Sequence, residues 1–223
     1  MKVADFIDGF RSSVGDNEVP YFWSAEDIVR YLNEAVQEAC ERAKLIEDRR
    51  TPTVCSLTLQ AGVSTYDLHP SVLEIKRLTL NGQKLDETSE EELDEDCPGW
   101  ELQAGKPSCF IFEQAAGVQP PRVRFVRSPV SAGAVALTVF RGALKPLRAD
   151  LDTAKPEIHE RFHERLMDWV LHRAYLKQDA DTFDPGKAAQ SLALFVQAFG
   201  ERPDANVQRK HRDRRPPVVQ INW

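Results

Sequence analysis

The sequence predicts an α+β protein in which helices from both ends of the chain form one helical bundle with an inserted antiparallel β module. Apolar residues repeat at helical spacing near the N-terminus and again after Pro156. Between these regions, short alternating runs separated by proline and glycine indicate strands. We expect four parts: N-terminal bundle helices in residues 1–50, the β module in 51–150, C-terminal bundle helices in 151–203 and an extended C-terminal tail in 204–223.

Composition limits the class of protein before any motif is considered. The chain has 223 residues, 42% hydrophobic and 29% charged, which is ordinary for a globular protein of one or two domains. The formal net charge of −6 disfavours nucleic-acid or anionic-membrane binding over the whole surface. No apolar run approaches the roughly 18 residues of a membrane span, and Asp5 and Asp8 interrupt the N-terminus. We therefore expect neither a membrane segment nor a signal peptide.

Two helices are expected near the N-terminus. Val3, Phe6 and Phe10 begin an apolar face that continues to Val14, before the break at residues 15–20. Ser24, followed three residues later by an aspartate, predicts the N-cap of a second helix. The alanine-rich stripe of this second helix predicts that it runs to about residues 46–48, and it comprises Ile28, Tyr31, Leu32, Ala35, Ala39, Ala43 and Ile46.

The β module is expected to consist of short strands. Cys55, Leu57 and Leu59 alternate with polar residues, which is typical of a half-buried strand. The Asn81-Gly82 pair predicts a tight hairpin between Leu73–Leu80 and Gln83–Leu85. Further strands are predicted at Thr65–Leu68, Phe110–Phe112, Arg122–Val126 and Val135–Phe140. Short strands at this spacing suggest an antiparallel sandwich or a small barrel.

Helical spacing returns at Pro156. One predicted helix carries Ile158, Phe162, Leu166, Trp169 and Leu176 on one face. Asp184-Pro185 supplies an N-cap and a rigid first residue for the next helix. The stripe of that helix ends at Gly200 and Pro203, and it comprises Ala188, Leu192, Phe195, Val196 and Phe199.

Charge is segregated along the chain. Residues 86–96 hold eight acids and no base. The default interpretation of such a run is a solvated acidic face. The functional interpretation is a negative surface aimed at a polyanion that must pass without sticking. The candidate residues of this acidic patch are Glu90, Glu91, Glu92, Asp94, Glu95 and Asp96.

The first part of the C-terminal tail carries a net positive charge, and its last residues are mostly apolar. Its basic part could contact phosphates without regard to sequence, or could meet acids on a protein partner. The apolar end favours the protein partner, because phosphate contacts do not need valine, isoleucine or tryptophan. The candidate docking residues are Arg209, Lys210, Arg212, Arg214, Arg215, Val219, Ile221 and Trp223.

One stretch matches the H-E-x-x-H zinc motif, with His159, Glu160 and His163 in the three defined positions. On a helix, the two imidazoles would share a face and could hold zinc. The extended form of the motif is missing, because Leu166 and Trp169 occupy its later positions. Histidines at the edge of a core are therefore the favoured interpretation, and a zinc-dependent hydrolase stays an alternative. The four cysteines have no C-x-x-C spacing, which favours reduced structural thiols.

Taken together, several segments resemble the head-to-tail adaptor (connector) proteins of tailed bacteriophages, and most closely the tail tubular protein A type. Phe22-Trp23-Ser24 followed by Tyr31-Leu32-Asn33-Glu34-Ala35 resembles the opening helix of these proteins. Tyr66-Asp67-Leu68-His69-Pro70 is similar to their inserted β module. Two later segments resemble the paired C-terminal helices of these adaptors: Pro156-Glu157-Ile158-His159 and the stretch from Ala174-Tyr175 to Asp184-Pro185.

This resemblance implies a structural virion protein and not an enzyme, with no cofactor and no metal. It implies a dodecameric ring beneath the portal protein, in the neck between head and tail, assembled from chains made in the host cytoplasm. The implied partners are the portal protein, the tail nozzle or tail tube protein, neighbouring copies of the chain, and double-stranded DNA that passes transiently, with no membrane. The alternatives are the zinc-dependent hydrolase and a DNA-binding module that uses the basic tail.

Overall fold

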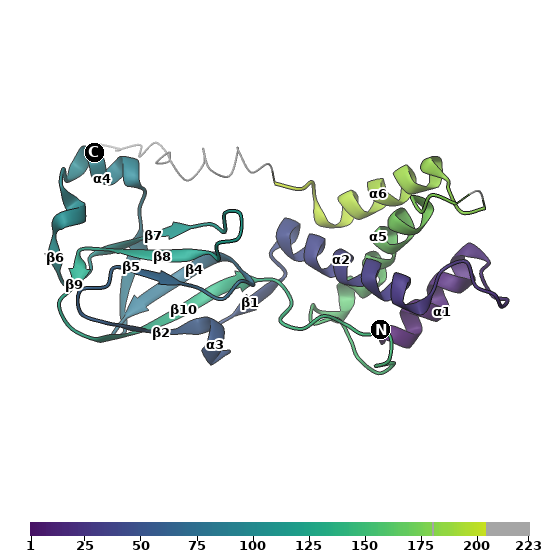
Figure 1. Ribbon diagram of the computed structural model, residues 1–223, viewed down its shortest axis with the longest axis horizontal. Helices are drawn as coiled ribbons and strands as arrows, with labels where there is room; N and C mark the ends of the chain where they lie inside the picture. Colours follow the sequence, from purple (N-terminus) through teal and green to yellow (C-terminus); the bar gives the residue numbers. More distant parts are fainter. Residues whose placement is uncertain (180, 204–223) are drawn as a thin grey trace, which may run out of the picture. The chain divides into compact units, whose positions relative to one another are not determined.

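The computed structural model describes residues 1–179 and 181–203. The chain divides into two compact units (Figure 1). The first unit, called the helical unit, combines Met1–Ile46 with Arg141–Arg202, and the second, called the sheet unit, contains Glu47–Phe140. The described part of the chain is mixed α+β, with six α-helices and a curled sheet, so the α+β class is confirmed.

Four helices form the helical unit: α1 (Val3–Val14), α2 (Ala25–Ala43), α5 (His163–Tyr175) and α6 (Pro185–Phe199). Helix α5 contacts each of the other three. The core between them is strongly apolar, and its fully buried side chains include Phe6, Phe10, Ile28, Leu32, Leu166 and Phe195. Burial of this apolar surface is the main source of stability for such a unit.

Both ends of α2 have a local cause. The Ser24 hydroxyl accepts a hydrogen bond from the amide of Asp27, so the predicted N-cap is confirmed. At the other end, Lys44 adopts the left-handed conformation (φ 50°) and terminates the helix. The prediction that α2 continues to residues 46–48 is therefore wrong. Instead, Ile46–Asp48 forms β1, which pairs with a distant strand.

Of the two C-terminal helices, α5 begins later than predicted and α6 begins where predicted. No α-helix begins at Pro156. A 3₁₀ turn, η2, spans Glu160–Phe162, and α5 begins at His163. The start of α6 is as predicted, because the Asp184 carboxylate accepts from the amide of Lys187 and Pro185 is the first helical residue.

An irregular segment, residues 142–157, precedes these helices and is held by polar contacts. Arg141 is 5% exposed and forms an ion pair with Glu157, whose second carboxylate oxygen accepts from the amide of Leu144 at 2.9 Å. The Asn33 side chain makes two hydrogen bonds to the backbone of Leu147, at 2.7 and 2.9 Å. These contacts satisfy backbone groups that no helix or strand satisfies.

The sheet unit is built around one curled sheet with the strand order β1-β10-β4-β5-β7-β8-β3, and β2 pairs with β10. Strands β6 and β9 form a separate parallel pair. The remaining elements are α3 (Pro52–Cys55), β2 (Ser56–Leu59), β3 (Thr65–Asp67), β4 (Val72–Leu80), β5 (Gln83–Glu87), α4 (Glu90–Asp96), η1 (Trp100–Leu102), β6 (Ala104–Gly105), β7 (Cys109–Glu113), β8 (Arg122–Val126), β9 (Ser128–Pro129) and β10 (Gly133–Arg141).

The predicted hairpin is confirmed. Strands β4 and β5 pair antiparallel, with Leu80 opposite Gln83. The two turn residues, Asn81 and Gly82, have φ values of 50° and 82°, and Asn and Gly tolerate such positive values better than other residues do.

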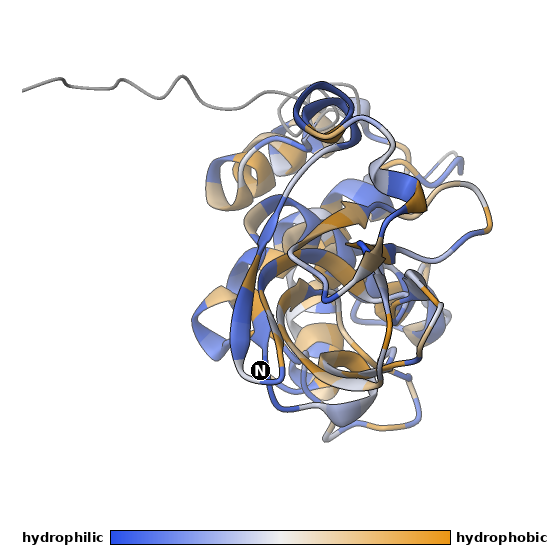
Figure 2. Cartoon of the chain, turned by 90° about the vertical axis from the view of Figure 1, so that its left-hand side faces the viewer, coloured by the Kyte–Doolittle hydropathy of each residue, from blue (hydrophilic) through white to orange (hydrophobic). Residues whose placement is uncertain are grey.

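The prediction of an antiparallel β module is wrong at two pairs, β6 with β9 and β5 with β7. Strand β5 pairs with β7 in parallel, with Asp86 opposite Cys109. A parallel pair requires a crossover connection, and here the crossover contains α4. The run expected as a solvated acidic face is thus partly helical. Figure 2 shows this crossover helix in blue, the hydrophilic end of the scale. The predicted start of the first strand at Cys55 is also wrong, because Pro52–Cys55 forms α3 and the strand begins at Ser56.

Candidate functional site

The acidic run of the sequence becomes an ordered helix in the sheet unit. Ser89 caps α4 by accepting a hydrogen bond from the amide of Glu92. Three glutamates occupy the first turn, where the helix dipole favours negative charge. The buried Leu93 attaches the helix to a small apolar cluster. Local electrostatics and one apolar anchor therefore explain why such a charged segment is helical.

Arg124 of β8 neutralises part of this charge. Its guanidinium lies 3.2 Å from the Glu90 carboxylate and 2.6 Å from the Glu101 carboxylate. The same guanidinium stands 4.5 Å from the centre of the Trp100 ring, a cation–π arrangement. The indole N–H of Trp100 donates to Asp94 at 2.9 Å. The acids at the start of α4 and in η1 are thus tied to the sheet.

Two acids of α4 are left without such a role. Glu91 and Glu95 are exposed, and no ion pair or hydrogen bond joins either side chain to another described residue. They are four residues apart, so they lie on the same face of the helix. By contrast, Glu92 accepts from the Thr88 hydroxyl at 2.8 Å. The helix therefore presents a fixed negative face centred on Glu91 and Glu95, while Glu90, Glu92 and Asp94 also serve the local structure.

The predicted docking tail lies beyond the residues that the structure describes. Its eight candidate residues lie outside the described part of the chain, as does the basic stretch on which the DNA-binding alternative depends: Arg209, Lys210, Arg212, Arg214, Arg215, Val219, Ile221 and Trp223. Both assignments stay predictions.

The H-E-x-x-H match does not form a metal site. His159 precedes the 3₁₀ turn and its Nδ1 accepts from the amide of Arg161. His163 is buried, its Nε2 donates to the Ile158 carbonyl oxygen at 2.9 Å, and its Nδ1 accepts from the Met1 amino group. Burial lowers the pKa of His163, which favours the neutral ring. Because both nitrogens of His163 have partners and the motif does not lie on one helix, the zinc-hydrolase alternative loses its geometric basis.

Other chemistry is sparse among the residues that the structure describes. They contain no group of three or more metal-ligating side chains. Among the same residues, no helix has the length and apolar character needed to cross a bilayer. All four cysteines are free thiols, with Cys40 and Cys55 buried. Burial is the main reason why the pKa of Cys40 is raised to about 12, so this thiol stays protonated.

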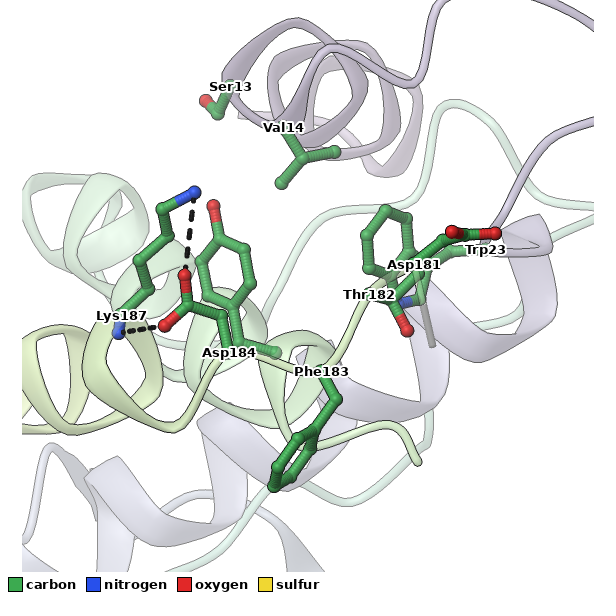
Figure 3. A pocket seen from close by; sticks show the side chains of 9 residues that line it. Ser13, Val14, Trp23, Asp181, Thr182, Phe183, Asp184 and Lys187 are labelled. Atoms are coloured by element: carbon green, nitrogen blue, oxygen red, sulfur yellow. Dashed lines mark hydrogen bonds and ion pairs between the residues drawn. The ribbon is translucent and has the colours of Figure 1, made fainter. Parts of the chain in front are cut away.

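Sequence reasoning missed a pocket in the helical unit. This pocket of about 260 Å³ lies at the end of α1 and beside the α5–α6 connection (Figure 3). Two of its three charged lining residues pair with each other: Asp184 accepts from the amide of Lys187 and lies 3.7 Å from the ammonium group of the same lysine, while the third, Asp181, is exposed. Asp184 is therefore a helix cap. The one sequence signal for Asp184 is the Asp-Pro pair, and this pair indicates a helix start and not a binding site.

A comparison with protein families gives the deciding observation: residues 1–220 match the model of the SU10 adaptor protein. The chain belongs to the SU10 adaptor protein family. A comparison with curated proteins finds no match. Membership supports a structural adaptor of bacteriophages that acts with portal and tail proteins in the virion, and it favours a non-enzymatic role. The resemblance to phage head-to-tail adaptors is thus confirmed at this level, while the likeness to the tail tubular protein A type stays a prediction.

Proposed function

We propose that the protein forms a ring beneath the portal of a tailed bacteriophage, joins the capsid vertex to the tail and gives passage to double-stranded DNA. The observation that carries this proposal is the family match over residues 1–220. The two dissimilar units of the chain support it. A closed ring uses heterologous contacts in which each copy offers two different surfaces, and two units of different structure can provide them.

Assembly with the portal tests the proposal. The full-length chain is measured alone and mixed with its portal protein, by native mass spectrometry. The proposal predicts a monomer alone and, with the portal, a complex that holds a ring of copies, which we expect to number twelve. A chain that stays monomeric beside an intact portal ring would contradict it.

The C-terminal tail is proposed to anchor the adaptor on the portal. Its arginines would meet acids, and Val219, Ile221 and Trp223 would fill apolar grooves or extend a sheet edge. Deletion of residues 208–223 is expected to leave a folded subunit that no longer assembles on the portal. Trp223→Ala separates the apolar from the charged contribution in the full-length chain. If the truncated subunit assembles normally, the tail is not the anchor.

The acidic patch is proposed to face the lumen of the ring or its rim, where repeated negative charge would repel the DNA backbone and let it slide. The exposure of Glu91 and Glu95 supports this role, and they are selected from the predicted run because neither side chain pairs with another described residue. The double variant Glu91→Gln/Glu95→Gln is expected to slow or stall DNA ejection. Asp8→Asn/Glu18→Gln is the matched control, because it removes the same charge from exposed positions of the helical unit. Equal ejection rates in the two variants would exclude a lumenal role.

A further inference from the structure

We propose that Arg124 is an ionic latch that holds the acidic crossover, defined here as residues 88–102, on the sheet, and that this crossover opens as a local unit when the latch weakens. The crossover contains α4 and η1. The latch is a property of the single subunit. Only its consequence for DNA passage rests on the proposed function.

One side chain joins both ends of the crossover to β8. Arg124 reaches Glu90 at the start of α4, at 3.2 Å, and Glu101 in η1, at 2.6 Å. Between these two contacts, its guanidinium lies over the ring of Trp100. The Arg124 side chain is 23% exposed, so water and salt reach the two ion pairs. Loss of Arg124 removes all three contacts at once and leaves the backbone pairing of β8 unchanged.

The apolar contact that holds the crossover is small. Its apolar attachment is a cluster of four buried side chains, Leu93 and Trp100 from the crossover and Ile111 and Val126 from the sheet, with two cysteines packed against it. Helix α4 has seven residues, fewer than the roughly 12–15 that an isolated helix needs to be even marginally stable. Its acids repel one another. A segment with a small apolar contact and a half-exposed ionic one has a low free energy of local opening.

Salt is therefore the expected trigger. Raised ionic strength screens charges that are exposed to solvent and weakens the pairs of Arg124 with Glu90 and Glu101. When the crossover opens, the negative face centred on Glu91 and Glu95 moves with it, while the strands keep their pairing. In an adaptor ring, this movement would displace the acidic face without unfolding the sheet unit.

Hydrogen exchange with mass spectrometry of the full-length chain tests the latch. Amides of Leu93 and Cys97 donate to backbone carbonyl groups inside the crossover and report on its opening. In Arg124→Ala, peptides from residues 88–102 are expected to exchange about tenfold faster, while peptides from β4 and β10 exchange as in the unsubstituted chain. Arg122→Ala is the matched control. Arg122 lies on the same strand and makes an ion pair of 2.7 Å with Asp67, away from the crossover.

Salt dependence gives the second readout. Exchange of residues 88–102 in the unsubstituted chain is expected to accelerate between low salt and 1 M salt. The Debye length falls to about 3 Å in 1 M salt, which is as short as the two ion pairs themselves. The Arg124→Ala variant is expected to lose this dependence. If that variant does not fold, Arg124→Lys and the salt series of the unsubstituted chain decide, because lysine keeps the charge but not the forked contact with two carboxylates.

The latch is overturned if Arg124→Ala leaves exchange in residues 88–102 unchanged, if all strands of the sheet unit accelerate together, or if the unsubstituted chain shows no salt dependence there. These measurements need neither the portal nor the ring. A chain that fails to assemble would contradict the proposed function and leave the latch intact, and a latch that fails would leave assembly untouched.

Discussion

In the helical unit, the side chain of Arg141 is 6% exposed and pairs with Glu157, which fixes the irregular segment before α5. In the sheet unit, the side chain of Arg124 is 23% exposed and pairs with two acids of the crossover. Both arginines hold a segment that has little regular structure of its own. They differ in how much water reaches the guanidinium, and in both cases the carboxylates are the more exposed partners.

This difference sets what each pair can do. The guanidinium of Arg141 is buried although the Glu157 carboxylate is 38% exposed, and a buried charge is costly when a partner is removed, so this pair is the more permanent attachment. A half-exposed pair contributes little net stability and responds to salt, so the Arg124 pair suits a segment that opens. The same residue type thus serves rigidity in one unit and adjustable attachment in the other.

The largest expected effect is at the pair of the buried Arg141 with Glu157. Glu157→Ala removes the carboxylate that pairs with the buried Arg141 guanidinium and accepts from the amide of Leu144, and it should lower the free energy of unfolding by about 3 kcal/mol. Urea denaturation measures it. Glu160→Ala is the control, because its pair with Lys155 is exposed, and it should not move the midpoint. Equal midpoints for the two variants would show that burial does not separate these pairs.

A smaller effect is expected from glycine-to-alanine substitutions, which compare the space around Gly133 in the sheet unit with the space around Gly142 in the helical unit. A Cβ atom at Gly133 would lie 2.7 Å from the Leu80 side chain, which is buried. Gly133→Ala should therefore cost about 1–3 kcal/mol through overpacking. At Gly142 the nearest atom is the end of the flexible, exposed Gln37 side chain, at 2.9 Å. Gly142→Ala should cost clearly less in the same denaturation experiment, and the reverse order would contradict this account of packing.

A pH effect of modest size is expected at Asp168 in the helical unit. Burial raises the pKa of this carboxyl, an effect that Arg165 partly offsets, and its Oδ2 atom has no hydrogen-bond partner. The folded state therefore binds the proton more tightly than the unfolded state. Stability should fall as pH rises from the unfolded pKa through the folded pKa. Asp168→Asn should remove this slope and raise the melting temperature at neutral pH, and a variant that melts lower there would contradict the assignment.

The smallest effect is a difference in thiol reactivity. Cys40 has a pKa raised to about 12 by burial and, secondarily, by Glu157. Iodoacetamide should therefore leave Cys40 unlabelled in the folded chain at pH 8, while the partly exposed Cys97 reacts first. Peptide mass spectrometry measures the labelling. Rapid labelling of Cys40 in the folded chain would mean that the interior of the helical unit opens easily.

The two units also differ in how far the sequence predicts them. The bounds of α1 and the capped start of α6 follow from local signals, an apolar period of 3.6 and an Asp-Pro pair. The clearest error occurs where pairing with a strand distant in the sequence decides the secondary structure. Ile46 continues the apolar spacing of α2, but its pairing with β10 makes it a strand. The predicted helical face starts too early at Ile158, which is buried without being helical.

In the sheet unit, the hairpin was predictable because Asn-Gly fixes its turn. The parallel pairing of β5 with β7 was not, because it depends on the crossover. One signal for that crossover is present: Ser89 followed three residues later by Glu92 is the start signature of a capped helix. The sequence also identified the acidic residues of the candidate site. It could not separate Glu91 and Glu95 from Glu90 and Asp94, since that requires the positions of Arg124 and Trp100.

Cryo-electron microscopy of the neck in virions of the phage that carries this chain tests the central claim most directly. The adaptor account predicts a ring of copies of this chain between the portal and the tail, with DNA or an open path along its axis. A neck in which other proteins fill that position, with this chain absent from it, would contradict the account.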